Sequence, residues 1–315
     1  MYKNLKENMN IIFAGSPYPS AKILDYLTKN SLNKVQAVLT KPDAAKKRGK
    51  KAFQSIVSEK AKSLNLCVYK PEELNDPEFK EKVMKLDVDI LIVSAYGKIL
   101  PNWLLELPKI MPINIHYSLL PRYRGASPIQ SSLINGDNYT GVSFMKMNEK
   151  LDEGDVLGSF KIKIEDDHNK NSLEEDLTDL AISKIDQVIK QVYSSNFSLK
   201  KQNNNLASYC SKIKKTDSLL DFNNTSESIF NKYKAYYEWP GVSFVHKKNI
   251  IKIAKMHISD HLSDAAPGEI IKFDKSGIHI KTANSVIVIT YLQFPNKSVI
   301  SSNDAFNAYK DFFAS

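Results

Sequence analysis

Cysteine, arginine and long apolar runs are scarce in this 315-residue sequence, and each shortage argues against a class of protein. Its two cysteines, Cys67 and Cys210, lie far apart and in no metal-ligand spacing, so we expect reduced thiols rather than a disulfide framework. No apolar run approaches the ~18 residues of a membrane helix, and residues 1–10 are polar. We therefore expect a cytoplasmic protein with neither a membrane span nor a secretory signal.

The basic charge of the chain comes almost entirely from lysine. There are 41 lysines against three arginines, Arg48, Arg122 and Arg124, and the formal net charge is +9. A positive balance is compatible with a nucleic-acid partner but does not establish one, because the whole chain is rich in lysine, asparagine and isoleucine. The rare arginines are more informative, since two of the three lie in one stretch, residues 113–130.

Alternating strand and helix patterns predict the architecture of the first part of the chain. Strands are predicted at residues 10–15, 36–40, 64–69, 88–95 and 113–116, with helices at 20–28 and 78–86. This alternation is typical of a Rossmann-like α/β fold with a doubly wound, mostly parallel sheet, in which ligands lie at the carboxyl ends of the strands. A dinucleotide site is not expected, because Pro17 stands where the second glycine of G-x-G-x-x-G belongs.

A change of pattern predicts a second domain. Ser172 and Glu175 have capping-box spacing, and an apolar stripe predicts that their helix continues to Tyr193. After a polar, asparagine-rich run and a helix at 226–236, close turns separate five short strands, at 243–245, 250–254, 268–273, 277–281 and 286–292. Such strands are typical of a small, OB-like β-barrel. We predict a catalytic domain over 1–195, a linker over 196–208 and a barrel domain over 209–315.

Residues 113–130 carry the most informative motif. They begin as a strand and continue as a loop with two prolines, a glycine and two arginines. Asn114 and His116 are two residues apart, so their side chains share one face of the strand. A later strand at 141–147 leads to a turn that contains Asp152, which can bring a carboxylate back to the same strand ends. An amide donor, an imidazole and a carboxylate suit oxyanion stabilisation and proton transfer.

These residues also have plainer structural interpretations. A lone histidine is usually structural, and we expect that role for the histidines at 168, 246, 257, 261 and 279. His116 differs because Asn114 shares its face and a Pro-Gly loop follows. Asp152, taken alone, is equally suited to capping a turn. No His, Cys and carboxylate cluster has metal-ligand spacing, so no metal is expected.

A basic segment, residues 41–51, lies between a predicted strand and a helix. It contains six basic residues and one acid. Composition alone leaves two interpretations open. The segment is either a solvated loop or a mobile arm that contacts a phosphate backbone through salt-sensitive charge interactions.

Over nearly its whole length the sequence resembles the methionyl-tRNA formyltransferases, a branch of the folate-dependent formyltransferases. The shared segments are residues 11–15, 41–43, 48–51, 95–97, 113–130, 151–155, 239–240 and 267–268. Within them, Asn-x-His-x-Ser-Leu-Leu-Pro marks the wider family, whereas the basic segment and the C-terminal barrel mark the tRNA branch. The sequence departs from that branch at Ala44, where an arginine is usual, and at Tyr117, where a small residue is usual.

The resemblance implies an enzyme that transfers the formyl group of 10-formyltetrahydrofolate, its co-substrate, to the α-amino group of methionine on initiator tRNA. It implies that Asn114 and His116 stabilise the oxyanion and that Asp152 assists proton transfer. The implied folate contacts are Tyr96, Gly97, Ser118, Leu119, Leu120, Pro121 and Asp155, the last of which is alternatively a loop cap. The implied tRNA contacts are Lys46, Lys47, Arg48, Lys50 and Lys51. We expect a monomer that binds no metal and no membrane.

Two other functions stay open. A formyltransferase that acts on an amino sugar nucleotide shares the catalytic segment but needs no long basic arm. A tRNA-binding protein that has lost catalysis keeps the basic segments but has no need of Asn114, His116 and Asp152 together. The three residues argue against the second alternative, and the basic segment argues against the first.

Overall fold

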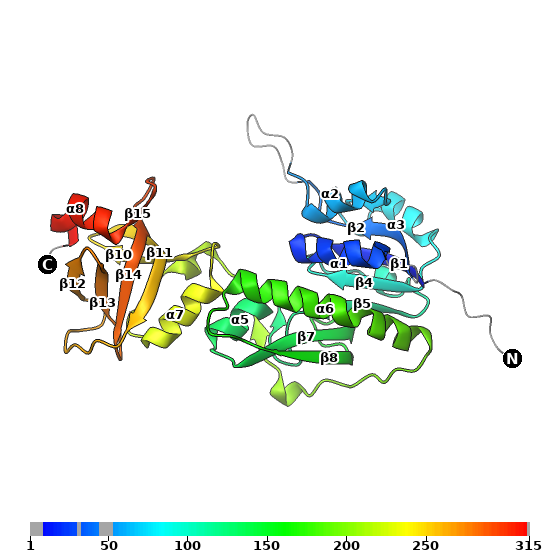
Figure 1. Ribbon diagram of the computed structural model, residues 1–315. Coiled ribbons are helices and arrows are strands. Elements are labelled where there is room, and N and C mark those ends of the chain that lie inside the picture. Colours follow the sequence, from blue (N-terminus) through cyan, green and yellow to red (C-terminus); the bar gives the residue numbers. More distant parts are fainter. Residues whose placement is uncertain (1–8, 30–32, 44–52, 314–315) are drawn as a thin grey trace. The chain divides into compact units, whose positions relative to one another are not determined.

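The computed structural model describes residues 9–29, 33–43 and 53–313 and divides the chain into two compact units. Unit 1 comprises Met1–Pro128, Tyr139–Lys163 and Glu174–Cys210. Unit 2 comprises Ile129–Asn138, Ile164–Leu173 and Ser211–Ser315. Each unit has its own main sheet, and Figure 1 labels most of the strands.

Unit 1 is built on a seven-stranded sheet with the strand order β3-β2-β1-β4-β5-β7-β8. Its strands are β1 (Met9–Gly15), β2 (Asn33–Leu39), β3 (Val68–Tyr69), β4 (Ile90–Ser94), β5 (Met111–His116), β7 (Tyr139–Lys146) and β8 (Val156–Lys163). The strands from β3 to β5 are parallel, and β7 and β8 run antiparallel to their neighbours. This arrangement confirms the predicted doubly wound, mostly parallel sheet.

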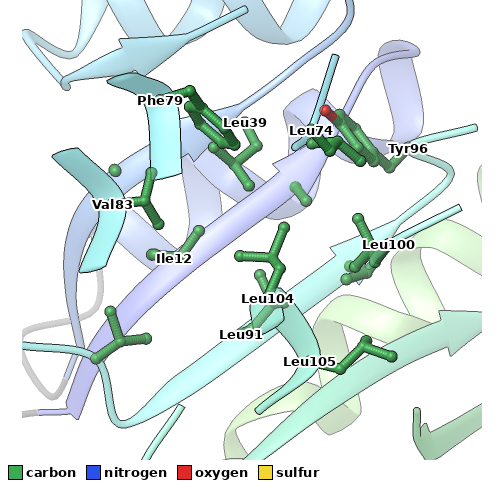
Figure 2. Packing of buried hydrophobic residues seen from close by; sticks show 14 residues of the cluster. Ile12, Leu39, Leu74, Phe79, Val83, Leu91, Tyr96, Leu100, Leu104 and Leu105 are labelled. Atoms are coloured by element: carbon green, nitrogen blue, oxygen red, sulfur yellow. The ribbon is translucent and has the colours of Figure 1, made fainter. Parts of the chain in front are cut away.

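The central strands of this sheet are buried on both faces. Every residue of β1 and of β4 is buried, as expected for parallel strands that helices cover on each side. On one face Ile12 and Leu91 pack in a cluster with Phe79 and Val83 of α3, as Figure 2 shows. The helices of this part of the chain are α1 (Tyr18–Lys29), α2 (Ile56–Ser63), α3 (Pro77–Met84), α4 (Asn102–Leu105) and α6 (Lys170–Tyr193), which crosses the division between the units.

The strand predicted over residues 64–69 is shorter in the structure. Only Val68 and Tyr69 pair with β2, because α2 continues to Ser63 and the chain then turns at Asn65, whose φ is 54°. The alternating segment that forms β8 carried no prediction. It lies at the edge of the sheet, and several of its side chains are exposed.

The start of α6 also differs from the prediction. The side-chain oxygen of Asn169 accepts hydrogen bonds from the backbone N–H groups of Asn171 (2.9 Å) and Ser172 (3.2 Å). Asn169 is therefore the N-cap residue, and Ser172 lies inside the first turn instead of opening a capping box with Glu175. The predicted helix and its end near Tyr193 are confirmed.

Unit 2 contains an antiparallel sheet with the order β10-β11-β14-β13-β12, in which β15 also pairs with β14. Its strands are β10 (Val242–His246), β11 (Asn249–Ser259), β12 (Ile270–Asp274), β13 (Gly277–Lys281), β14 (Val286–Gln293) and β15 (Val299–Ser301). The sheet confirms the predicted C-terminal domain of antiparallel strands, and β15 is additional to the five predicted strands; closure of these strands into an OB-like barrel stays a prediction. Its helices are α5 (Pro128–Ile134), the predicted α7 (Ser226–Ala235) and the unpredicted α8 (Ser302–Phe313), which packs Phe306 and Phe313 against Phe273.

Candidate active site

Three side chains that the sequence singles out meet beside β5 in unit 1. The side-chain Nδ2 of Asn114 donates to Oδ1 of Asp152 over 3.2 Å. The Nδ1 atom of His116 lies 3.6 Å from Oδ2 of the same carboxylate. The His116 side chain is 5% exposed and that of Asp152 is 11% exposed, so the contacts lie in a largely dry environment. The structure therefore brings together an amide, an imidazole and a carboxylate, as predicted.

The partners of His116 define which ring nitrogen exchanges a proton. Its Nε2 atom lies 2.9 Å from the backbone carbonyl oxygen of Tyr123. A carbonyl oxygen accepts but does not donate hydrogen bonds, so Nε2 carries a hydrogen in both protonation states of the ring. The exchangeable proton consequently belongs to Nδ1, the nitrogen that faces Asp152.

A strained turn holds the carboxylate in place. Asp152 has a φ of 52°, in the left-handed region that non-glycine residues seldom adopt. The backbone N–H of Gly125 donates to its Oδ2 atom over 2.8 Å. Two residues further on, a side chain at Gly154 would overlap the carbonyl oxygen of Lys146, so only glycine fits there. The turn thus combines backbone strain with a close approach to β7.

The loop after β5 is fixed by two buried hydroxyls. Ser118 donates to the carbonyl oxygen of Arg122 over 2.6 Å, and Ser143 on β7 donates to the carbonyl oxygen of Ser118 over 2.7 Å. The Ser143 oxygen also accepts from the backbone N–H of Leu120, at 3.1 Å. Ser118 is fully buried and holds the turn, whereas the three following residues of the predicted folate segment, Leu119, Leu120 and Pro121, are partly exposed.

The other predicted folate residues lie in different surroundings. Tyr96 is 1% exposed and belongs to the apolar cluster of Figure 2. Its hydroxyl has no hydrogen-bond partner within the described residues, and burial raises the pKa of Tyr96 to about 12. Gly97 is exposed, and the Lys41 ammonium occupies the space that a side chain there would need. Asp155 is partly buried, and its backbone carbonyl accepts from the N–H of Lys146 over 2.8 Å.

The five residues predicted to contact tRNA fall outside the described part of the chain. They are Lys46, Lys47, Arg48, Lys50 and Lys51. The described residue before this gap, Asp43, forms an ion pair with Lys70. Beyond the gap, Phe53 is 75% exposed.

Sequence reasoning did not find a second group of polar residues beside the site. Arg124, noted only as a rare arginine, is 1% exposed. Its guanidinium donates to Gln202 Oε1 (3.0 Å), to the Tyr209 hydroxyl (2.9 Å) and to Asn204 Oδ1 (2.8 Å). Gln202 carries no local signal, because it lies in a polar run whose composition is typical of a loop. Its contacts depend on the tertiary fold.

Fold and site together define a class of protein. A doubly wound sheet with an amide donor, an imidazole and a carboxylate beside one of its strands has the groups that a transfer reaction through a tetrahedral oxyanion requires. Within the described residues no group of three or more His, Cys, Asp or Glu side chains is arranged to hold a metal ion. No described helix is long and apolar enough to cross a membrane.

Comparison with protein families specifies this class. The family model described as Formyl transferase matches residues 9–189, and that described as Formyl transferase, C-terminal domain, matches residues 212–310. Together the two matches span most of both units. The chain therefore belongs to the formyl transferase family.

Solved structures share the fold at low sequence identity. The N-formyltransferase from Helicobacter canadensis, in complex with folinic acid and dTDP-3-aminofucose, is 19% identical with a TM-score of 0.67, and the match covers 91% of this chain and 100% of that one. WlaRD, a sugar 3N-formyl transferase solved with dTDP and 5-N-formyl-THF, is 17% identical with a TM-score of 0.67, covering 93% and 100%. HypX from Aquifex aeolicus, with tetrahydrofolic acid, is 15% identical with a TM-score of 0.62, covering 95% and 47%.

Proposed function

We propose that this chain transfers a formyl group from 10-formyltetrahydrofolate to a primary amine. The observation that carries the proposal is the set of Asn114, His116 and Asp152, in which the Asp152 carboxylate accepts from Asn114 and lies 3.6 Å from Nδ1 of His116, in a chain of the formyl transferase family. The folate derivatives bound by the three structural relatives support a folate as the formyl donor.

The proposed reaction assigns one task to each side chain. The amine nitrogen attacks the formyl carbon, and the carbonyl electrons move to oxygen. Asn114 has two N–H groups; one donates to Asp152, and the second is proposed to donate to the oxyanion. His116, protonated at Nδ1, adds positive charge next to that oxyanion. Asp152 then assists the transfer of a proton from the attacking amine to the folate nitrogen, as the bond between that nitrogen and the formyl carbon breaks.

The folate is proposed to lie against the loop after β5. The partly exposed Leu119, Leu120 and Pro121 offer apolar surface for a flat pterin, and Ser118 keeps their backbone in place. The Tyr96–Gly97 turn after β4 is proposed as a second wall, with the Tyr96 ring supporting it from the core. Asp155 completes the proposed set as a polar contact beside the Asp152 turn.

The proposed acceptor is the α-amino group of methionine esterified to initiator tRNA. The basic segment 41–51 supports this choice, with Lys46, Lys47, Arg48, Lys50 and Lys51 as proposed backbone contacts. The β-sheet of unit 2 offers a second argument. Lys252 and Lys255 on β11 are exposed, and Lys255 pairs across the sheet with the exposed Tyr291. Lysine beside an exposed aromatic ring is typical of surfaces that bind RNA by charge and stacking.

An amino sugar nucleotide is a second candidate acceptor, which the structural comparisons favour. The Helicobacter canadensis enzyme and WlaRD are described with dTDP-linked ligands, and each is covered over its full length. Their sequence identities to this chain are 19% and 17%. At this level the similarity shows a shared fold but does not identify the acceptor. The small acceptor would require the same three catalytic side chains.

One assay separates these candidates. Purified protein is supplied with 10-formyltetrahydrofolate and, in separate reactions, with charged initiator tRNA or a dTDP-linked amino sugar. We expect formylmethionyl-tRNA as the product. Product with the amino sugar alone would replace the tRNA acceptor by the second candidate, and absence of product with both would overturn formyl transfer by this chain.

A further inference from the structure

The polar segment at residues 200–210 belongs to unit 1 and folds back onto the two loops that carry the site. Its last two residues form β9 (Tyr209–Cys210), which pairs in parallel with β6 (Arg124–Gly125). A side chain at Gly125 would overlap the carbonyl oxygen of Cys210, which shows how closely the two backbones approach. The segment is therefore a structural part of the site.

One side chain of this segment, Gln202, joins both catalytic loops. Its Nε2 atom donates to the carbonyl oxygens of Asp152 (2.8 Å) and Gly154 (2.7 Å), and its Oε1 atom accepts from Nε of Arg124 (3.0 Å). Exchanging the amide oxygen and nitrogen would set an acceptor against two carbonyls and a donor against a guanidinium, so the network fixes the orientation. Gln202 is 8% exposed, so few water molecules can reach its partners and take over these hydrogen bonds.

These bonds act on the turn that positions the carboxylate. Asp152 is in the left-handed region, and a non-glycine residue keeps this strained conformation only where contacts with its surroundings hold it. The two hydrogen bonds from Gln202 restrain the peptide groups at Asp152 and Gly154. The same turn directs one carboxylate oxygen at Asn114 and the other at His116. Loss of the restraint is expected to let the turn relax and the carboxylate move.

Arg124 secures the other end of the amide. A buried guanidinium requires partners for its charge and its N–H groups. Beyond Gln202, these partners are Asn204 and Tyr209, and the Glu153 carboxylate lies 3.6 Å from Nη1. Arg124 also precedes Gly125, whose N–H donates to the Asp152 carboxylate. The amide of Gln202 thus spans from the loop after β5 to the loop after β7.

We propose that Gln202 is a positioning residue for formyl transfer: it holds the Asp152 turn in the geometry that places the carboxylate between Asn114 and His116. The proposal rests on the proposed function for its kinetic consequence, but its geometric consequence is independent of any activity. Gln202 itself touches no reacting atom. It acts through the backbone of Asp152 and Gly154.

The test variant is Gln202→Glu, which keeps an acceptor for Arg124 and removes the donor to both carbonyls. Its matched control is Asn203→Asp, the neighbouring exposed amide, whose side-chain oxygen accepts from the N–H of Asn205. Both changes add one negative charge one residue apart. We expect kcat of Gln202→Glu to fall at least about tenfold, an increase in barrier of about 1.4 kcal/mol, while KM for the folate stays within about twofold and thermal unfolding shows a folded protein. Asn203→Asp is expected to match the wild type.

Crystal structures of the wild type and of Gln202→Glu test the geometry without substrate. We expect the wild type to keep the Asp152 carboxylate within ion-pair distance of His116 and the variant to move it out of that distance. An unmoved carboxylate in the variant, or an unchanged kcat beside an active wild type, overturns the positioning role. Absence of product from the wild type with both acceptors would instead overturn the proposed function, and the structures would still decide the role of Gln202.

Discussion

The backbone N–H of Gly125 donates to Oδ2 of Asp152 over 2.8 Å, and this bond joins the loops that follow β5 and β7. The same oxygen faces Nδ1 of His116. A backbone donor has fewer degrees of freedom than a side chain, so it limits the positions that the carboxylate can take. The geometry of the site therefore depends on how closely β6 and β9 pack.

Gly125→Ala tests that packing. The residue has a φ of 118°, and a Cβ there would overlap the Cys210 carbonyl oxygen. Strain of this kind costs about 1–3 kcal/mol, and we expect that loss in the free energy of unfolding, measured by urea denaturation. The control is Ala126→Ser at the exposed neighbouring position, which should change it by less than about 0.5 kcal/mol. Equal stability of Gly125→Ala and the wild type would contradict the close approach.

His116→Ala tests the role of the imidazole. A positioned acid or base group contributes about 100-fold to 10,000-fold in rate, so we expect kcat to fall by at least about 100-fold. Far-UV circular dichroism should show an intact fold. His116→Gln should be equally slow, since an amide cannot gain the positive charge proposed for Nδ1. The exposed His261, changed to Ala, serves as the control and should leave kcat unchanged. Near-normal turnover by either His116 variant would remove the residue from the mechanism.

Charge removal in the basic segment tests the acceptor. Neutralising Lys46, Lys47, Arg48, Lys50 and Lys51 together should raise KM for tRNA and flatten its dependence on salt. Each phosphate contact that is lost lowers the slope of log K against log salt by about 0.7–0.9. In the control, Lys82 on α3 and Lys85 directly after it, which pair with Glu78 and Glu81, are changed to Ala. An unchanged slope in the five-residue variant would show that the segment is a solvated loop that makes no contact with tRNA phosphates.

Tyr96→Phe tests the buried hydroxyl. A buried polar group without a partner costs about 1–3 kcal/mol, and the Tyr96 hydroxyl has no partner among the described residues. Its removal should therefore raise the free energy of unfolding of the ligand-free protein, by about 1 kcal/mol in urea denaturation. Tyr139→Phe, at a half-exposed position, should leave it nearly unchanged. A destabilised Tyr96→Phe protein would show that the hydroxyl is bound by the protein.

Much of the fold follows from local patterns. The runs that form β1 and β4 are apolar throughout, so their burial could be predicted without knowledge of their neighbours. The start of α6 could not, because Asn169 and Ser172 are both good capping residues three positions apart and the backbone path decides between them. The strand β8 was not predicted from the sequence, because an edge strand with exposed side chains resembles a loop in composition.

The site divides in the same way. Asn114 and His116 were predictable because strand geometry places residues i and i+2 on one face. Gln202 was not, since it contacts Asp152 and Arg124 across 50 and 78 positions of the sequence. The polar segment around Gln202 has no sequence pattern that would predict such contacts. The residues proposed for chemistry are thus local in sequence, and those proposed to position them are not.

The most direct test of the account is the single-turnover rate of formyl transfer from 10-formyltetrahydrofolate to methionyl initiator tRNA, measured for the wild type and for Asp152→Asn. The substitution preserves shape and one acceptor oxygen but removes the charge that faces His116. We expect product from the wild type and a rate at least about 100-fold lower from the variant. Equal rates would contradict the catalytic set.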